Sequence, residues 1–121
     1  PEFGDFNSGF AFIDPILELG AHVAPTGVAF YNGSMFPKQM KNNLFIALHG
    51  SWNRSSKAGY KVIRVSFDKN GNVEESNDFI SGWLQNESVF GRPSAPFILS
   101  DGSMLLSDDK ANVIYRITYE L

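Results

Sequence analysis

Hydrophobic residues along this chain gather in short runs of strand length, which are separated by residues typical of turns. In the first half, the runs are GVAFY (27–31), NLFIAL (43–48), YKVIRVSF (60–67) and the more polar VEESNDFI (73–80). In the second half, they are GRPSAPFIL (91–99), SMLLS (103–107) and NVIYRITY (112–119). Short runs rich in β-branched and aromatic residues predict β-strands, and no segment has the spacing of an amphipathic helix.

The segments between these runs carry residues that favour turns. Asn32-Gly33, Asp101-Gly102 and the stretch DKNGN (68–72) all tolerate the positive φ that a hairpin turn requires. The beginning of the chain is different, because GDFNSGFAF (4–12) is rich in glycine and has no period. We therefore expect residues 1–21 to form an N-terminal arm or loop that leads into the first strand.

The order of the strands repeats along the chain. GVAFYNG matches PFILSDG, LFIAL matches MLLSD, and VIRVSF matches IYRITY, with Arg64 and Arg116 at equivalent places on the less apolar face. A repeat of about 50 residues with three or four short strands is typical of a β-propeller blade. We therefore predict an all-β chain of about two antiparallel blades: a four-stranded blade over 22–84 and an incomplete, three-stranded final blade over 85–121.

Two blades cannot close a ring, so the pattern favours the C-terminal fragment of a larger propeller. Such a fragment would have unpaired strand edges and could associate with itself through them. A small, self-contained β-sandwich is the alternative, since seven short strands would also suit that fold.

Composition excludes several classes of function. The chain has 121 residues, a formal net charge of −3 and scattered basic residues, which argues against a nucleic-acid surface. It has no cysteine, and hence no disulfide, thiolate nucleophile or cysteine-based metal site. No apolar run approaches the roughly 20 residues needed to span a membrane.

Consecutive antiparallel strands place their connecting loops alternately at two edges. The loops expected at one edge are 19–25, 49–59, 86–93 and 108–111. Those expected at the opposite edge are 32–42, 68–72 and 100–103, which are mostly turn residues. The first edge is therefore the candidate site, because rigid scaffolds commonly carry binding residues on their loops.

Four side chains of this edge are the candidate binding residues: His22, His49, Arg54 and Arg92. Arginine recognises carboxylates in a bidentate manner, and histidine and tryptophan offer hydrogen bonding and stacking. Together they predict a mouth for an anionic, planar ligand.

Each of these residues also has a structural interpretation. His22 could be a satisfied structural donor, and Arg54 could pair with Asp108 or Asp109. Trp52 and Trp83 could simply pack between the sheets. Asp108 and Asp109 have too few further oxygen ligands nearby in the sequence to predict a cation site.

Three segments together resemble the C-terminal part of the glucose/sorbosone dehydrogenase family, and HGSWNR is most similar to its sorbosone-dehydrogenase-like branch. The segments are HVAPTGVAFYNG (22–33), NNLFIALHGSWNRSSKAGYKVIRV (42–65) and GRPSAPFILSDGSMLLSDDKANVIYRITY (91–119). Members of that family are six-bladed β-propellers that use pyrroloquinoline quinone. The resemblance implies a quinoprotein oxidoreductase, of which this chain would be a fragment of the six-bladed ring.

The resemblance also implies a chemistry and a set of roles. The parent protein would oxidise a sugar or aldose by hydride transfer to the quinone, with Ca²⁺ polarising the quinone and an electron acceptor as partner. His22, His49, Arg54 and Arg92 would bind the cofactor. The general base and the metal ligands would lie outside this piece, so the fragment alone would be inactive. Family habit implies a periplasmic or secreted protein.

Two other functions stay open from the residues. A non-catalytic propeller could use the same mouth to bind a carbohydrate or a protein partner, because one fold hosts many functions. The chain could also be an interaction domain that pairs through its exposed strand edges.

Overall fold

The computed structural model describes residues 13–120, and these form three antiparallel sheets. The first sheet contains, in order, β1 (Pro25–Phe30), β2 (Leu44–Leu48), β3 (Lys61–Phe67) and β4 (Val73–Ile80). A small hairpin pairs β5 (Leu84–Gln85) with β6 (Ser88–Val89). The second sheet contains β7 (Pro93–Ile98), β8 (Met104–Asp108) and β9 (Val113–Ile117). A 3-10 turn, η1 (Lys38–Met40), lies between β1 and β2.

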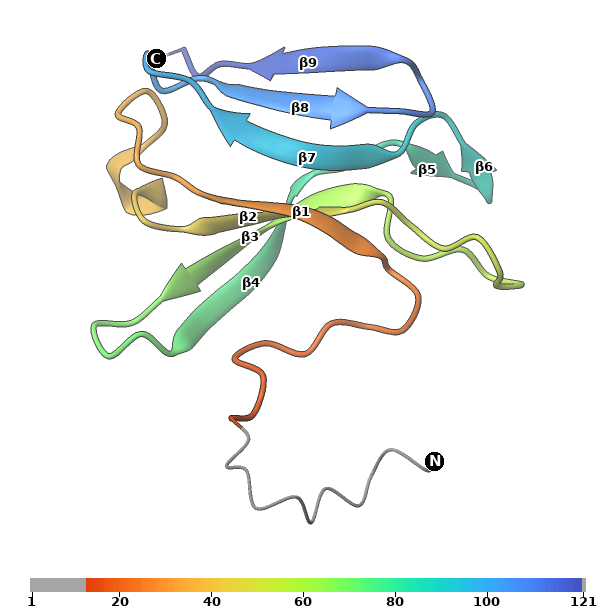
Figure 1. The fold of residues 1–121 in the computed structure, drawn as a ribbon, viewed down its shortest axis with the longest axis horizontal. Coiled ribbons are helices and arrows are strands. Elements are labelled where there is room, and N and C mark those ends of the chain that lie inside the picture. Colours follow the sequence, from red (N-terminus) through yellow and green to blue (C-terminus); the bar gives the residue numbers. More distant parts are fainter. Residues whose placement is uncertain (1–12, 121) are drawn as a thin grey trace.

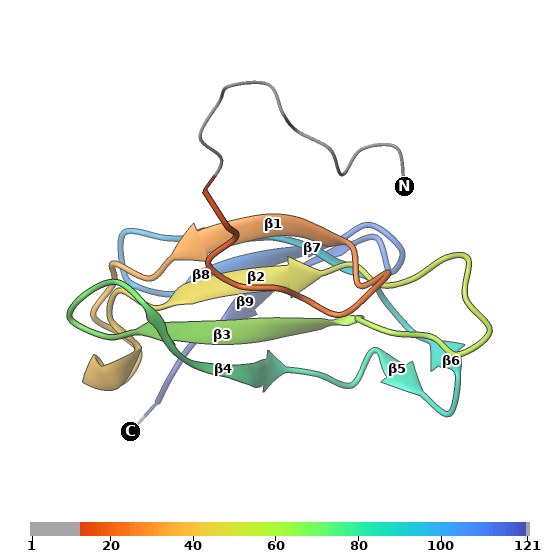
Figure 2. The ribbon, with the colours of Figure 1, turned by 90° about the horizontal axis from the view of Figure 1, so that it is seen from below.

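The second sheet packs on one face of the first (Figure 1), and the first sheet runs in order from β1 to β4 across the view from below (Figure 2). The two sheets approach most closely at β1 and β7. Thr26 donates its hydroxyl to the carbonyl of Ser94 at 2.8 Å. A Cβ on Gly27 would lie 2.6 Å from that same carbonyl oxygen, so only glycine allows this approach.

The sequence repeat is reproduced in the strand register. β1 pairs with β2 with an irregularity between Pro25 and Gly27, and β7 pairs with β8 with the same irregularity between Pro93 and Ala95. In the third strand of each unit, Arg64 lies opposite Phe45 and Arg116 lies opposite Leu105. The two units are therefore the same three-stranded meander, and equivalent positions can be read from the pairing.

The main core lies between the two sheets. Phe45, Ala47 and Val62 of the first sheet are buried in one cluster with Met104 and Leu106 of the second. Burying such side chains stabilises the fold by about 25 cal/mol for each Å² of apolar surface removed from water.

Tyr31 fixes the end of this core at the edge opposite the candidate site. Its ring is completely buried and stacks on Phe36 with 4.7 Å between ring centroids. Its hydroxyl accepts a hydrogen bond from the backbone N–H of Phe36 and donates one to the carbonyl of Gly102, at 2.8 and 2.9 Å. Both sheets are thus tied to a single buried hydroxyl.

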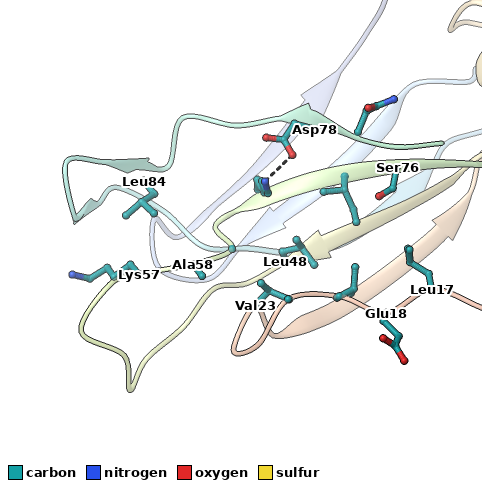
Figure 3. A pocket seen from close by; sticks show the side chains of 15 residues that line it. Leu17, Glu18, Val23, Leu48, Lys57, Ala58, Ser76, Asp78 and Leu84 are labelled. Carbon is teal, nitrogen blue, oxygen red and sulfur yellow. Dashed lines mark ion pairs between the residues drawn. The ribbon is translucent and has the colours of Figure 1, made fainter. Parts of the chain in front are cut away.

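The opposite face of the first sheet carries a second apolar cluster of Ile46, Leu48, Ile63 and Val65. The segment 17–23, which leads into β1, packs against this cluster. Between segment and sheet lies a groove of about 640 Å³, in which Lys61 and Asp78 form an ion pair at 2.7 Å (Figure 3).

The predicted all-β, antiparallel fold is confirmed, with one four-stranded and one three-stranded sheet. The finer prediction, that these sheets are two blades of a larger propeller, is not supported: residues 13–120 form two stacked sheets and a hairpin, without a ring of blades. The β5–β6 hairpin was not predicted, because its two-residue strands are too short to give a periodic signal. The loop or arm expected at 4–12 lies outside the described residues. Within 13–120, no helix is long and apolar enough to cross a membrane.

Candidate functional site

The loops predicted to share one edge do so. The segment before β1, the β2–β3 connection and the β8–β9 connection all lie at the same end of the strands, beside the β5–β6 hairpin (Figure 1). Because the sheets are stacked and their strands run alternately up and down, side chains far apart in sequence meet there.

His49 and Asp109 form the central pair of this edge. Each follows directly after a strand, and the shared register makes them equivalent residues of the two meanders. His49 Nε2 lies 2.8 Å from Asp109 Oδ1, with side-chain exposures of 19% and 67%. The hydrogen bond from the His49 ring lowers the pKa of the Asp109 carboxyl. A carboxylate in this position orients the imidazole ring.

Arg92 holds the loop that carries His49. Its guanidinium donates to the carbonyls of His49 at 3.1 Å, Gly50 at 2.5 Å and Ser51 at 3.3 Å. It also lies over the Tyr60 ring, 5.5 Å from the centroid. The loop closes tightly there, because Gly50 has a φ of 98° and a Cβ on it would lie 2.6 Å from the Tyr60 ring. Through these contacts, Arg92 supports the loop from within the protein.

Asp108, at the end of the neighbouring strand of the same sheet, fixes the backbone of Arg92. Its side chain is 2% exposed, and its Oδ1 accepts hydrogen bonds from the backbone N–H groups of Arg92 and Ala111, both at 2.9 Å. Its Oδ2 accepts the hydroxyl of Tyr115 at 3.1 Å, and that hydroxyl receives the indole N–H of Trp83 at 3.3 Å. Asp108 is therefore a buried structural carboxylate that ties the β8–β9 turn to the strand entry at Arg92.

Arg54 and His22 lie together farther out on the edge. Arg54 donates to the carbonyl of Ala21 at 3.0 Å, which places its guanidinium next to the turn that holds His22. His22 is exposed and has a φ of 63°. Asp109 binds His49, and Arg54 binds the Ala21 carbonyl. The alternative in which Arg54 pairs with Asp108 or Asp109 is therefore wrong.

The two tryptophans differ in their exposure to solvent. Trp83 packs against the main core, as the structural interpretation proposed, whereas Trp52 is 85% exposed at the tip of the long loop. An indole so exposed leaves its face open to a ligand or a partner.

Beside Arg92, a shallow hollow of about 290 Å³ opens between the long loop, the β5–β6 hairpin and the β8–β9 turn. It is lined by Ser51, Trp52, Lys57, Tyr60, Val89, Arg92 and Lys110. Three cations and two aromatic rings give it the character of a site for a planar anion, although Glu87 lies 3.7 Å from the ammonium of Lys57.

Sequence reasoning considered Asp109 as a partner of Arg54 and did not predict its pair with His49, nor did it single out Lys57 and Lys110. The sequence did contain a signal for Asp109. When LFIAL is aligned with MLLSD, Asp109 occupies the same position in the second unit as His49 in the first. The two lysines carried no such signal, because the loop path alone decides that they line one hollow.

A calcium ion does not fit what this part of the chain offers. Across residues 13–120, no three His, Asp or Glu side chains come together as a metal site would require. Calcium takes six to eight oxygen ligands. The absence of metal-ligating residues was predicted for this chain, and it remains a prediction.

The His49–Asp109 pair predicts a pH dependence of stability. Because the pKa of Asp109 is lower in the folded state, its contribution is present above the unfolded value of about 4 and is lost as the pH falls through the lowered pKa. The difference in free energy of unfolding between the native chain and Asp109→Ala should therefore be constant near neutral pH and shrink on acidification. Urea unfolding at a series of pH values measures it; a difference that grows towards low pH would contradict the pair.

Comparison with known proteins assigns a family different from the one expected. A model of the TrAA12-like family matches residues 6–120. An uncharacterized protein of Borreliella burgdorferi is 50% identical over 111 residues, which are 90% of this chain and 29% of that protein. The chain thus spans less than a third of the length of that relative. The resemblance to the glucose/sorbosone dehydrogenase family, including its sorbosone branch, was wrong.

Other relatives agree with this assignment. A pyrroloquinoline quinone-dependent pyranose dehydrogenase of Coprinopsis cinerea is 43% identical over 53 residues, 44% of this chain and 6% of that protein. The holo form of the pyranose dehydrogenase PQQ domain from the same organism has a TM-score of 0.63 at 25% identity, covering 81% of this chain and 27% of that one. The calcium structure of a Trichoderma reesei family AA12 protein has a TM-score of 0.69 at 22% identity, covering 87% and 26%, and shows likeness of fold.

Proposed function

From the premise that this chain belongs to the TrAA12-like family, we propose that it forms part of an oxidoreductase that oxidises a sugar with pyrroloquinoline quinone. The pyranose dehydrogenase relative supports the sugar class and the cofactor. One observation supports this proposal most strongly. The His49–Asp109 pair, Arg54 and a hollow lined by cationic and aromatic side chains all lie at the same end of the two sheets.

The residues of the edge suit this quinone, which is planar and carries carboxylates. Arg54 is exposed, and its hydrogen bond to the Ala21 carbonyl uses one guanidinium nitrogen, so further donors face solvent. Lys57 and Lys110 add positive charge, and the exposed Trp52 indole offers a stacking surface. When bound, the quinone supplies the electron acceptor for the sugar, and the protein supplies binding and orientation.

His49 acts here as an oriented hydrogen-bonding group. Its Nε2 faces Asp109, which fixes the ring plane and leaves Nδ1 for a further partner. His22 extends the edge on the side of Arg54. Arg92 is a positioning residue, because its hydrogen bonds to three backbone carbonyls hold the loop that carries His49.

We assign Ca²⁺ to the larger protein, with ligands outside residues 13–120. The calcium structure of the Trichoderma reesei family AA12 protein supports this assignment, as does the lack of a ligand cluster within residues 13–120. By the same reasoning, this chain alone should bind the quinone more weakly than a complete enzyme and should not turn over sugar. For the larger protein we propose a periplasmic or secreted location.

The role of Arg54 is testable by titration. Pyrroloquinoline quinone added to this chain should quench the fluorescence of exposed Trp52, and Arg54→Ala should weaken binding roughly ten- to hundredfold, the range of a charge-assisted hydrogen bond. Arg116→Ala is the matched control, because that arginine pairs with Asp101 at the opposite edge. Equal weakening in both variants would indicate nonspecific attraction between the anion and the surface.

The reaction itself is tested on a full-length protein. The Borreliella burgdorferi relative, loaded with the quinone and Ca²⁺, should oxidise pyranose sugars with a dye as electron acceptor. No sugar oxidation by that protein in a broad sugar panel would overturn the proposed reaction, while leaving the quinone titration of this chain as a separate result.

A further inference from the structure

The β5–β6 hairpin carries a glutamate at a position where its backbone is unfavourable. Asn86 and Glu87 form the two-residue turn between the strands, with φ values of 48° and 64°. A hairpin turn with positive φ at both central residues favours glycine in the second place, because a side chain there crowds the backbone. Non-glycine residues held in such conformations gather at functional sites. The strain therefore points to a role for the Glu87 side chain.

The Glu87 carboxylate binds the long loop between β2 and β3. Its Oε2 accepts a hydrogen bond from the backbone N–H of Lys57 at 2.9 Å, and the same oxygen lies 3.7 Å from the Lys57 ammonium. Lys57 and Leu84 of β5 line the same groove, and both are labelled in Figure 3. Lys57 thus presents a backbone N–H and a positive charge to one carboxylate, and charge-assisted hydrogen bonds of this kind are the usual means of carboxylate recognition.

Lys57 also lines the hollow of about 290 Å³ beside Arg92. Trp52 and Lys110 line this hollow too, and the Trp52 indole is 85% exposed. Within residues 13–120, Lys110 forms no ion pair, so its charge is available to a ligand. A planar ligand that stacks on the indole and carries several carboxylates could therefore use both lysines.

We propose that the N–H and ammonium of Lys57 form a carboxylate-binding position of this hollow, and that Glu87 fills this position until an anionic ligand displaces it. The ligand class is planar aromatic compounds with two or more carboxylates. The inference rests on the proposed function only in that pyrroloquinoline quinone is one member of this class. Glu87 is then an internal competitor that sets how tightly the hollow binds an anion.

The exchange needs no buried charge to lose its partner. The side chains of Lys57 and Glu87 are 36% and 52% exposed, so the displaced carboxylate returns to water. Exposed ion pairs are weak, and a ligand that adds stacking and a second cation can outcompete this one. Removing the internal carboxylate should therefore strengthen binding, whereas removing a purely structural brace would weaken it.

Titration with benzene-1,3,5-tricarboxylate, which is planar and has no redox chemistry with sugars, tests the proposal. Glu87→Gln should bind this probe about three- to tenfold more tightly than the native chain, the range expected when one exposed ion pair and its hydrogen bond stop competing. Chemical shifts of backbone amides in NMR spectra give the affinity. The Lys57 amide should shift both on the substitution and on addition of the probe.

Glu75→Gln is the matched control. It removes the same charge from another exposed ion pair, because Glu75 Oε2 lies 3.5 Å from Arg64 and the Glu75 side chain is 58% exposed. Its affinity for the probe should stay within about twofold of the native value, since β4 contributes no residue to the hollow. An equal gain in both variants would show that net charge alone sets the affinity, and would overturn the proposal.

A substitution at Lys57 locates the binding position. In a Lys57→Met background, Glu87→Gln should lose most of its gain, because the ammonium for which the two carboxylates compete is gone. A gain that persists in full would contradict the assignment to Lys57.

Glu87→Gly is the second variant, and it guards against a misfolded first one. Glycine suits the positive φ of this turn, so the hairpin should persist, and the probe should bind at least as tightly as to Glu87→Gln. Weaker or unchanged binding in both variants, or no binding of the probe to any of them at about 10 mM, would overturn the proposal. A gain with this probe but no binding of pyrroloquinoline quinone would support the inference and count against the proposed function.

Discussion

Replacing Asp108 by Ala is expected to lower the free energy of unfolding by about 3–5 kcal/mol, the largest loss anticipated for a single residue of the edge. The substitution removes the acceptor of two backbone N–H groups and one tyrosine hydroxyl at once. Asp108 is 2% exposed, so water cannot readily replace these bonds. The backbone N–H groups of Arg92 and Ala111 would then lose their acceptor at a partly buried site.

Urea unfolding at neutral pH measures this loss, and Asp109→Ala is its natural control. The two aspartates are neighbours, but Asp109 is largely exposed and its histidine partner can return to water, so its removal should cost far less. Similar losses for the two variants would show that the buried bonds of Asp108 contribute little. The Asp108→Ala variant should also loosen the loop that Arg92 holds, visible as faster hydrogen exchange at Gly50 and Ser51.

Replacing Gly27 by Ala is expected to cost about 3 kcal/mol by forcing the two sheets apart. The added Cβ would lie 2.6 Å from the carbonyl oxygen of Ser94 and 2.7 Å from the Cα of Ala95. Both are backbone atoms and cannot move without shifting β7. The main core would then lose close packing along its whole length.

Gly20→Ala serves as the control for this change, because the nearest atom to its new Cβ would be Val23 Cγ1 at 3.9 Å, an ordinary contact. Its stability should stay within about 0.5 kcal/mol of the native chain. Thermal unfolding of both variants compares them directly. An unchanged midpoint for Gly27→Ala would mean that β1 and β7 are not held as closely as the structure has them.

Much of the local structure followed from the sequence. The DKNGN stretch predicted a hairpin turn, and Asp68 accepts hydrogen bonds there from the N–H groups of Asn70 and Asn72. The match of VIRVSF to IYRITY predicted that Arg64 and Arg116 are equivalent, and both lie at the same register position. Such features depend on neighbours in sequence or on a period of two, and for this reason they could be predicted.

The roles of the edge residues did not follow from residue type. Arg92 had the chemistry to bind a ligand's carboxylate, yet its contacts are with carbonyls of a loop more than 40 positions earlier in the chain. Asp108 and Asp109 are adjacent and identical, but one is a buried brace and the other faces His49. Packing between sheets decides which group meets which partner, and no local pattern encodes that.

By itself, the sequence determined that this protein is built of antiparallel strands, where its turns lie, that its two halves repeat, and which loops share an edge. Hydrophobic alternation and turn chemistry act over a few residues, and strand direction alternates by necessity. Only the tertiary structure decided that His49 meets Asp109, that Arg92 supports the loop, and which sheet faces stay uncovered. Those outcomes depend on how closely two sheets approach, which is set by side-chain volumes and by buried hydrogen bonds between residues distant in the chain.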